Sequence, residues 1–220
     1  MPINTEKYTF GEELANAISH VSGAALSVVA LVLMVVYSAN HGTSLHIVCS
    51  VVFGVSMILL YTWSGLMHWL PVGTAKKVFL KFDQIGIFLL IAGTYTPFTL
   101  LAMKGTIGWV IFGIEWGLAV IGIIIKSLEK EKLGKHVPTY YVVMYVIMGW
   151  LIVFDINHLF HTIGLWGFVF LMGGGVFYTL GVVFFRMHKV RYHHLVWHIF
   201  VILGTIMHFI SVYFYVLPLK

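Results

Sequence analysis

The sequence of 220 residues has few charged side chains and a single cysteine. Asp, Glu, Lys and Arg make up 10% of the chain, whereas soluble domains carry about 25%. Hydrophobic residues make up 60% of it, more than a water-soluble fold of this length could bury. This composition excludes a soluble globular protein and predicts one integral membrane domain that covers residues 1–220.

The lone cysteine, Cys49, excludes a disulfide framework within the chain. It also argues against a thiolate metal site, so any transition-metal site has to use histidines and carboxylates. The formal charge is +5. Because the basic residues lie in short segments between apolar runs, they indicate membrane orientation, and the sequence predicts no nucleic-acid partner.

Long apolar runs dominate what is present. A helix needs about 20 mostly apolar residues to cross a bilayer. Seven runs qualify, at roughly 15–38, 45–69, 79–102, 107–126, 138–154, 163–185 and 194–217. The strands of a membrane barrel would alternate polar and apolar side chains, which these runs do not. The predicted fold is therefore all-α, a bundle of seven transmembrane helices.

The Lys and Arg residues predict how this bundle sits in the membrane, because cytoplasmic loops are enriched in them. With seven spans, only Lys104 and Lys220 fall on one side. The other side holds Lys7, Lys76, Lys77, Lys81, Lys126, Lys130, Lys132, Lys135, Arg186, Lys189 and Arg191. We therefore expect a cytoplasmic N-terminus and a C-terminus outside.

Polar side chains from several spans fall at the depth of the cytoplasmic leaflet. Ser64 and His68 lie four apart near the end of span 2, and Asp83 lies in the first predicted turn of span 3. His194 and His198 lie one turn apart at the start of span 7. Polar groups at membrane depth need partners, so these side chains are expected to meet.

A metal ion is a partner that suits this set. Histidines four apart on a helix present two ring nitrogens to one metal. A third histidine from another span would complete a three-histidine site with an open fourth position, the form that catalytic zinc takes. The spacing and depth of these residues thus predict a metal site that His194 and His198 would share with a histidine of another span, such as His68, and they make Asp83 and Ser64 candidate catalytic side chains.

Structural roles also explain several of these residues. Ser64 could form a hydrogen bond between helices, and Asp83 could cap its helix or pair with a lysine at 76, 77 or 81. Glu13, Asn16 and His20 are spaced along one face of span 1. They would form either a second layer around the metal or a polar network that holds span 1 in register.

Two further polar residues lie deeper in the apolar runs. Glu115 is in the middle of span 4, where a carboxylate is either functional or protonated and hydrogen-bonded to a neighbouring helix. His208 lies ten residues after His198, about 15 Å along a helix, too far to bind the same metal. In span 6, the glycines at 173–175 would permit close approach of another helix.

A family resemblance runs through most of the chain. The stretches that carry it are GEELANAISHVSGAAL (11–26), SGLMH (64–68), FDQIGIFLLIAGTYTPF (82–98), YVIMGW (145–150), GGGVFYTLGVVFF (173–185) and HHLVWHIFVILGTIMHF (193–209). In this order they resemble the hemolysin III family, the bacterial branch of the progestin and adipoQ receptor superfamily. The superfamily is distantly similar to alkaline ceramidases.

The resemblance implies a seven-helix bundle in a bacterial inner membrane. It also implies zinc bound by His68, His194 and His198, with Asp83 matching a carboxylate close to the zinc and Ser64 a serine near it. Some relatives hydrolyse the amide of ceramide-like lipids, and bacterial members are linked to membrane-lipid homeostasis.

Three functional hypotheses are compatible with these features. The first is a zinc-dependent hydrolase of a membrane lipid amide, whose substrate or ligand is a fatty acyl or N-acyl lipid. The second is a non-enzymatic, receptor-like or regulatory factor of membrane homeostasis with a structural zinc. The third is a pore-forming hemolysin, which fits poorly because seven long apolar spans cannot be secreted as a soluble monomer.

Overall fold

The computed structural model describes residues 8–131, 133–134 and 136–219, and all of its regular elements are helical. In chain order these are α1 (Phe10–His41), α2 (Ser44–Trp69), α3 (Thr74–Pro97), the π-helical η1 (Phe98–Met103), α4 (Gly105–Leu128), α5 (Thr139–Gly149), the 3₁₀ helix η2 (Leu151–Asp155), α6 (Ile156–Arg186), α7 (His193–Ser211) and the π-helical η3 (Val212–Val216). These ranges contain no strand, which confirms the all-α prediction. Four lysines used to predict orientation, Lys7, Lys132, Lys135 and Lys220, lie outside the described residues.

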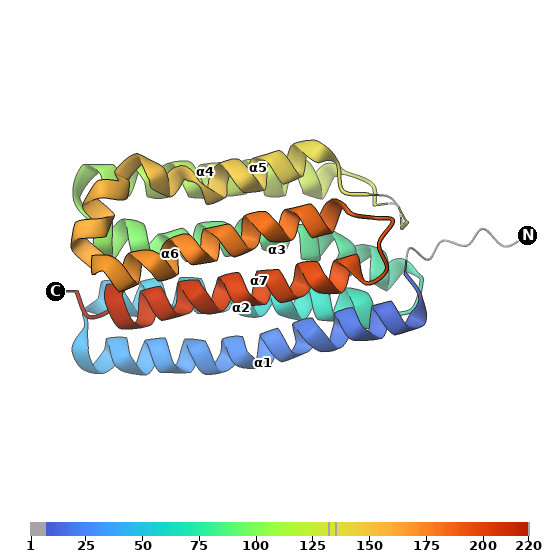
Figure 1. Ribbon diagram of the computed structural model, residues 1–220, viewed down its shortest axis with the longest axis horizontal. Helices are drawn as coiled ribbons and strands as arrows, with labels where there is room; N and C mark the ends of the chain where they lie inside the picture. The colour runs from blue at the N-terminus through green and yellow to red at the C-terminus, as the bar shows by residue number, and fades with distance from the viewer. Residues whose placement is uncertain (1–7, 132, 135, 220) are drawn as a thin grey trace, which may run out of the picture.

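The helices lie along one common axis and form a bundle (Figure 1). α1 packs against α2 and α7, α2 packs against α3, and α6 packs against α7. α4 and α5 cover the side of the bundle that faces away from α1, and both contact α3. α3 is the most enclosed helix, since most of its apolar stretch is buried. α1 begins at one end of the bundle and η3 ends at the other (Figure 1).

Six helical stretches in the described chain are long and apolar enough to cross a membrane. They are Phe10–His41, Ser44–Trp69, Thr74–Met103, Gly105–Leu128, Thr139–Arg186 and His193–Val216. The chain is therefore a multi-pass membrane protein. Five of these stretches correspond to the predicted spans 1–4 and 7, and Thr139–Arg186 contains the predicted spans 5 and 6.

The stretch Thr139–Arg186 is not one straight helix. α5 ends at Gly149, η2 follows, and Gly164 inside α6 has the non-helical angles φ 67° and ψ 177°. Positive φ is accessible to glycine because it lacks a Cβ atom. Figure 1 shows α5 beside α4 at one side of the bundle and α6 nearer to α7.

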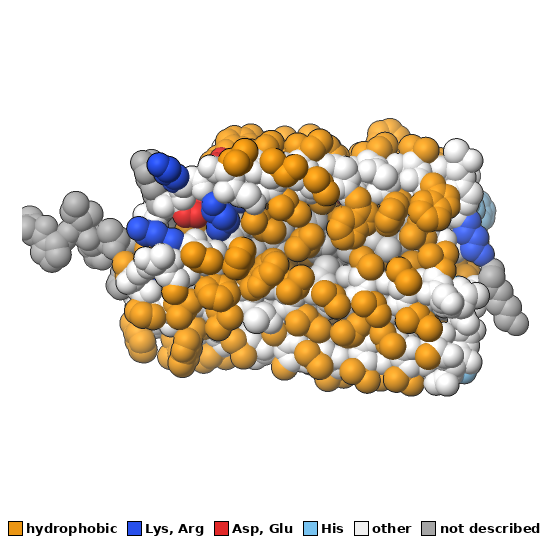
Figure 2. All heavy atoms as spheres, turned by 180° about the vertical axis from the view of Figure 1, so that it is seen from behind, with side chains coloured by type: hydrophobic (Ala, Val, Ile, Leu, Met, Phe, Trp, Pro, Cys, Tyr) orange, Lys and Arg blue, Asp and Glu red, His pale blue; other side chains and the backbone are white. Residues whose placement is uncertain are grey.

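The surface of the bundle suits a lipid environment. On α1, for example, Val29, Val32 and Val36 are each more than half exposed. Figure 2 shows hydrophobic side chains spread over the middle of the visible face, with most of the visible Lys and Arg side chains at the end where α1 begins. An exposed apolar surface of this extent is unusual in soluble monomers and typical of membrane proteins.

The start of α3 differs from the prediction. The helix begins at Thr74, before the predicted residue 79, so that Asp83 lies in its third turn and not in its first. The apolar run underestimates the helix because its first turns carry lysines. Lys76 is nevertheless buried, and its Nζ donates to the carbonyls of Met67 (2.8 Å) and Leu70 (3.2 Å) at the end of α2. These bonds satisfy carbonyl groups that a helix end leaves without partners.

Candidate metal centre

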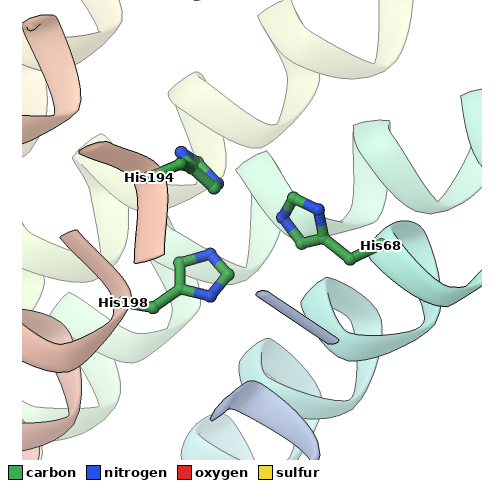
Figure 3. Close-up of side chains that lie close together, drawn as sticks. All are labelled: His68, His194 and His198. Atoms are coloured by element: carbon green, nitrogen blue, oxygen red, sulfur yellow. The ribbon is translucent and has the colours of Figure 1, made fainter. Parts of the chain in front are cut away.

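Three histidines from two helices form one buried cluster (Figure 3). His68 is in the last turn of α2, and His194 and His198 are in the first two turns of α7. Each offers a ring nitrogen, and the three nitrogens all lie within 4.8 Å of one another. The side chains are 2%, 7% and 1% exposed, respectively. Among the described residues this is the one group of at least three His, Cys, Asp or Glu side chains with metal-binding spacing.

Helix α1 holds the first of these rings. Glu13 Oε2 lies 2.5 Å from His68 Nδ1, and Glu13 Oε1 lies 3.0 Å from Lys76 Nζ. An ionised carboxylate can only accept, so Nδ1 of His68 donates to it. In the neutral imidazole, Nε2 then keeps its lone pair. Nε2 is buried without a hydrogen-bond partner among the described residues, as a nitrogen available to a metal would be.

A second α1 side chain, Ser19, acts on His198 in the same way. Ser19 Oγ lies 2.8 Å from the carbonyl oxygen of Asn16 and 3.0 Å from His198 Nδ1. The carbonyl can only accept, so Ser19 donates its one proton there and accepts a hydrogen bond from Nδ1. The lone pair of His198 is therefore also on Nε2. The sequence reasoning missed Ser19, because a serine on an apolar helix is common and its partner is 179 residues away.

Tyr8, two residues before the start of α1, packs on the same cluster and was also missed. Its ring is stacked on His194 at a centroid distance of 5.1 Å and lies 6.0 Å from the ring of His68. Burial raises the pKa of the Tyr8 phenol above its usual range, so the phenol stays neutral. The start of α1 is held near α7 because Glu12 Oε1 accepts a hydrogen bond from the main-chain nitrogen of Tyr192 (2.9 Å).

A cavity of about 190 Å³ leads from the cluster into the bundle, and apolar side chains form most of its wall. Ser64 and Asp83 line it together with His194 and His198. Asp83 is close enough to Ser64 and His68 to interact with both. Ser64 Oγ is buried and forms no well-aligned hydrogen bond within the described part of the chain.

The structural alternatives for Asp83 do not describe its surroundings, whereas the interaction of Ser64 on α2 with Asp83 on α3 is compatible with the alternative for Ser64, a hydrogen bond between helices. Asp83 cannot cap α3 from its third turn. Lys76 pairs with Glu13, and Lys81 Nζ donates to the carbonyls of Ser127 and Glu129. The bundle thus leaves Asp83 and Ser64 at the cavity wall, beside the three histidines.

The three polar residues that were predicted on one face of α1, Glu13, Asn16 and His20, lie in two different environments. Glu13 binds His68, whereas His20 is stacked on His198 with ring centroids 3.4 Å apart and planes 10° from parallel. The side chains of Asn16 and His20 have no hydrogen-bond partner among the described residues, so the three side chains do not form one connected network.

Two other predicted residues lie apart from the cluster. Glu115 is completely buried in α4, and neither of its carboxylate oxygens has a hydrogen-bond partner in the described part of the chain. His208 lies farther along α7 and lines the same cavity as the cluster, with its Nε2 3.0 Å from the carbonyl oxygen of Leu171. His208 is not part of the three-histidine group, in agreement with the distance argument from the sequence.

Known proteins are similar to this chain over most of its length. The family model described as "Haemolysin-III related" matches residues 8–209. Hemolysin-3 of Bacillus cereus is 42% identical over 207 residues, which cover 94% of this chain and 93% of the relative. The Hemolysin-3 homolog of Bacillus subtilis (strain 168) is 39% identical over 208 residues, covering 94% of this chain and 96% of the relative.

A more distant similarity extends to animals. The human monocyte to macrophage differentiation factor is 28% identical over 170 residues, covering 74% of this chain and 68% of the relative. The region matched by the family model contains the three clustered histidines, Asp83 and Ser64. The resemblance expected from the sequence is confirmed, and the chain belongs to the haemolysin-III-related family.

Proposed function

We propose that this protein is a zinc-dependent hydrolase of a membrane lipid amide. The observation that carries the proposal is the three-histidine cluster beside Asp83, at one end of a mostly apolar cavity. Metal ligands, a candidate proton acceptor and space for a hydrocarbon chain are thereby brought to one place.

The residues present fit zinc. Three imidazoles are a ligand set found in catalytic zinc sites. His68 and His198 each have Nδ1 held by α1, through Glu13 and Ser19, which leaves Nε2 as the metal-binding nitrogen. An outer partner of this kind commonly fixes the orientation of a metal-binding imidazole. The buried Nε2 of His68 without a partner is the atom that a metal would satisfy.

The chemistry assigned to the chain is hydrolysis of an amide. When bound, zinc supplies a Lewis acid for the carbonyl and for water. Asp83 accepts the proton that the attacking water loses and returns it to the departing nitrogen. Ser64 Oγ donates a hydrogen bond to the carbonyl oxygen as negative charge develops there. A C–O bond forms, the C–N bond breaks, and the products are a free fatty acid and an amine.

We further propose seven membrane crossings, with a cytoplasmic N-terminus, in the inner membrane of a bacterium. The break at Gly164 and the separate course of α5 and α6 support two crossings by Thr139–Arg186. The number of crossings is then odd, which agrees with the opposite positions of the start of α1 and the end of η3 in Figure 1. The three histidines would lie near the cytoplasmic face, where most basic residues are expected.

A structural zinc in a non-enzymatic regulatory protein is the second candidate, and one observation favours it. A metal held by His68, His194 and His198 would join α2 to α7, and α1 is attached through Glu13 and Ser19. Loss of the metal would then loosen three helices at once. In this case His68→Ala would unfold the protein or lower its melting temperature, whereas a catalytic zinc predicts a folded, inactive variant.

The experiment is a turnover assay on purified, zinc-loaded protein. The protein is incubated with ceramides and other N-acyl lipids, and released fatty acid is measured. We expect release by the wild type and a loss of about 100-fold or more in Asp83→Asn, the range that general acid–base catalysis contributes. Lys81→Gln is the matched control, because Lys81 lies two residues away and contacts the carbonyls of Ser127 and Glu129. Absence of turnover with every lipid amide, at full zinc occupancy, contradicts the hydrolase.

A further inference from the structure

Lys76 on α3 is a buried lysine, whereas the next residue, Lys77, is exposed. A buried ammonium group is costly unless it is paired and hydrogen-bonded. Nζ of Lys76 lies 3.0 Å from Glu13 Oε1. It also donates to the carbonyl oxygens of Met67 (2.8 Å) and Leu70 (3.2 Å). One side chain of α3 is therefore attached both to the start of α1 and to the end of α2.

All three partners of Lys76 are connected to His68. Met67 directly precedes this histidine in α2, and Leu70 follows it by two residues. Their carbonyl groups fix the main chain on either side of His68. The second carboxylate oxygen of Glu13, Oε2, lies 2.5 Å from Nδ1 of the ring. Lys76 thus acts on His68 through the backbone that carries the ring and through the carboxylate that contacts it.

An alternative role for Lys76 is contact with a ligand, because its side chain lines the main cavity. An ammonium group has three N–H donors. The contacts with Glu13, Met67 and Leu70 use all three. A ligand could gain a hydrogen bond from Lys76 only at the cost of a contact that holds His68. The arrangement therefore favours a role toward the histidine cluster over one toward a ligand.

We propose that Lys76 is a positioning residue of the metal centre, which orients His68 for zinc without touching the ion. This inference rests on the metal centre of the proposed function. Lys76 holds Glu13, Glu13 holds Nδ1 of His68, and Nε2 of that ring is left for the metal. The positive charge of Lys76 compensates the mostly buried carboxylate, so that Glu13 stays between the ammonium group and the imidazole.

The test measures the zinc affinity of Lys76→Met. The full chain in detergent micelles is titrated with zinc in competition with a chromophoric chelator. Methionine keeps an unbranched side chain but removes the charge and the three donors. We expect zinc affinity to fall by about tenfold, at the lower end of the effect of losing an outer partner of a metal-binding histidine. A folded Lys76→Met variant with the zinc affinity of the wild type overturns the proposal.

Lys81→Met is the matched control. Lys81 lies on the same helix, and its Nζ donates to the carbonyls of Ser127 and Glu129 at the end of α4. It makes the same kind of contact to a helix end as Lys76 does, but to a helix without a clustered histidine. Zinc affinity should stay near that of the wild type even if the melting temperature falls. Equal losses of zinc affinity in the two variants overturn the proposal, because general loosening of helix ends would explain them.

A double variant tests whether Lys76 acts through Glu13. Lys76→Met should weaken zinc binding less in a Glu13→Gln background than in the wild type, since residues of one network are not additive. Losses that simply multiply overturn the proposal. Lys76→Gln removes the charge but keeps an amide donor for one carbonyl. It takes the place of Lys76→Met, with the same expectations, if the methionine variant does not fold.

Nuclear magnetic resonance of the metal-free protein, labelled with ¹⁵N-histidine, gives a readout that does not depend on zinc. The Nδ1 proton of His68 should give a downfield signal in the wild type and in Lys81→Met, because it is bonded to a carboxylate. We expect this signal to disappear in Glu13→Gln and to shift in Lys76→Met. An unchanged signal in Lys76→Met overturns the proposal.

The outcomes separate the positioning role from the hydrolase. Zinc binding by the wild type with no effect of Lys76→Met overturns the positioning role and leaves the hydrolase in place. A loss of zinc affinity in Lys76→Met, in a protein that hydrolyses no lipid amide, supports the positioning role and contradicts the hydrolase. If the wild type binds no zinc, both proposals are overturned.

Discussion

Glu13 Oε2 on the first helix lies 2.5 Å from Nδ1 of His68 on the second. With Ser19, which lies 3.0 Å from Nδ1 of His198, this contact gives α1 control over two rings of a cluster to which it contributes no histidine. In both rings the nitrogen that remains for a metal is Nε2. Zinc affinity is therefore expected to depend on residues of α1 that would not touch the ion.

The first prediction concerns Glu13→Gln, which removes the carboxylate charge and changes the side-chain shape little. We expect the affinity for zinc to fall by about 10- to 100-fold, the usual effect of losing the outer partner of a metal-binding histidine. The measurement is a competition titration of the purified protein against a chromophoric zinc chelator.

The neighbouring carboxylate provides the control for this prediction. Glu12 accepts hydrogen bonds from Thr9 and from the main-chain nitrogen of Tyr192, so Glu12→Gln alters the helix start without touching His68. It should leave zinc affinity near that of the wild type. Equal effects of Glu12→Gln and Glu13→Gln would mean that general loosening of α1, and not the bond to His68, controls the metal.

The second prediction compares two serines of α1. Ser19→Ala should weaken zinc binding by about fivefold, because a neutral hydrogen bond contributes about 1 kcal/mol. Ser27→Ala removes a hydroxyl that donates only to the carbonyl of Gly23, so it should have no effect on zinc. The same chelator titration measures both variants, and an unchanged affinity in Ser19→Ala would contradict the assignment of Nε2 as the ligand atom of His198.

The third prediction concerns the packing of α6 on α7. A Cβ atom on Gly174 would lie 2.2 Å from the ring of His208 and 3.0 Å from the carbonyl oxygen of Gly204. We expect Gly174→Ala to lower the free energy of unfolding by about 1–3 kcal/mol, as overpacking of a tight core does. Gly117→Ala, where nothing lies within 4 Å of the new atom, is the control. Thermal unfolding in detergent compares the two, and equal melting temperatures would contradict the close approach.

The fourth prediction tests the number of crossings between residues 139 and 186. In a Cys49→Ser background, single cysteines replace Lys104, His161 or Lys189, all of which are exposed. If α5 and α6 cross separately, a membrane-impermeant maleimide labels His161→Cys and Lys104→Cys in intact cells. Lys189→Cys reacts only after permeabilisation. Labelling of Lys189→Cys in intact cells would contradict the proposed topology.

The helices were predictable because the apolar runs are long and their dividers are short. The start of α3 was misplaced because Lys76 and Lys77 are helical but polar, so they fall outside an apolar run. The break in α6 was not visible either, since Gly164 adopts positive φ in a segment where other glycines remain helical.

The proximity of the three histidines could be predicted from their spacing in the sequence and from their expected depth in the membrane. His194 and His198 share a helical face, and span direction places His68 at the same level. Contacts that depend on the rotation of one helix against another could not be predicted. The bonds of Ser19 to His198 and of Lys76 to the end of α2 are of this kind, because each helix has several polar residues that could have faced inwards.

The most direct test of the account is the zinc content of the purified protein. Elemental analysis is carried out on wild type and on His194→Ala, after both are shown to be folded by circular dichroism. We predict one zinc ion per chain in the wild type and a loss of most of it in the variant. A wild type that contains no divalent metal after exposure to zinc, or a variant that retains the full amount, would contradict the three-histidine centre on which the proposed function depends.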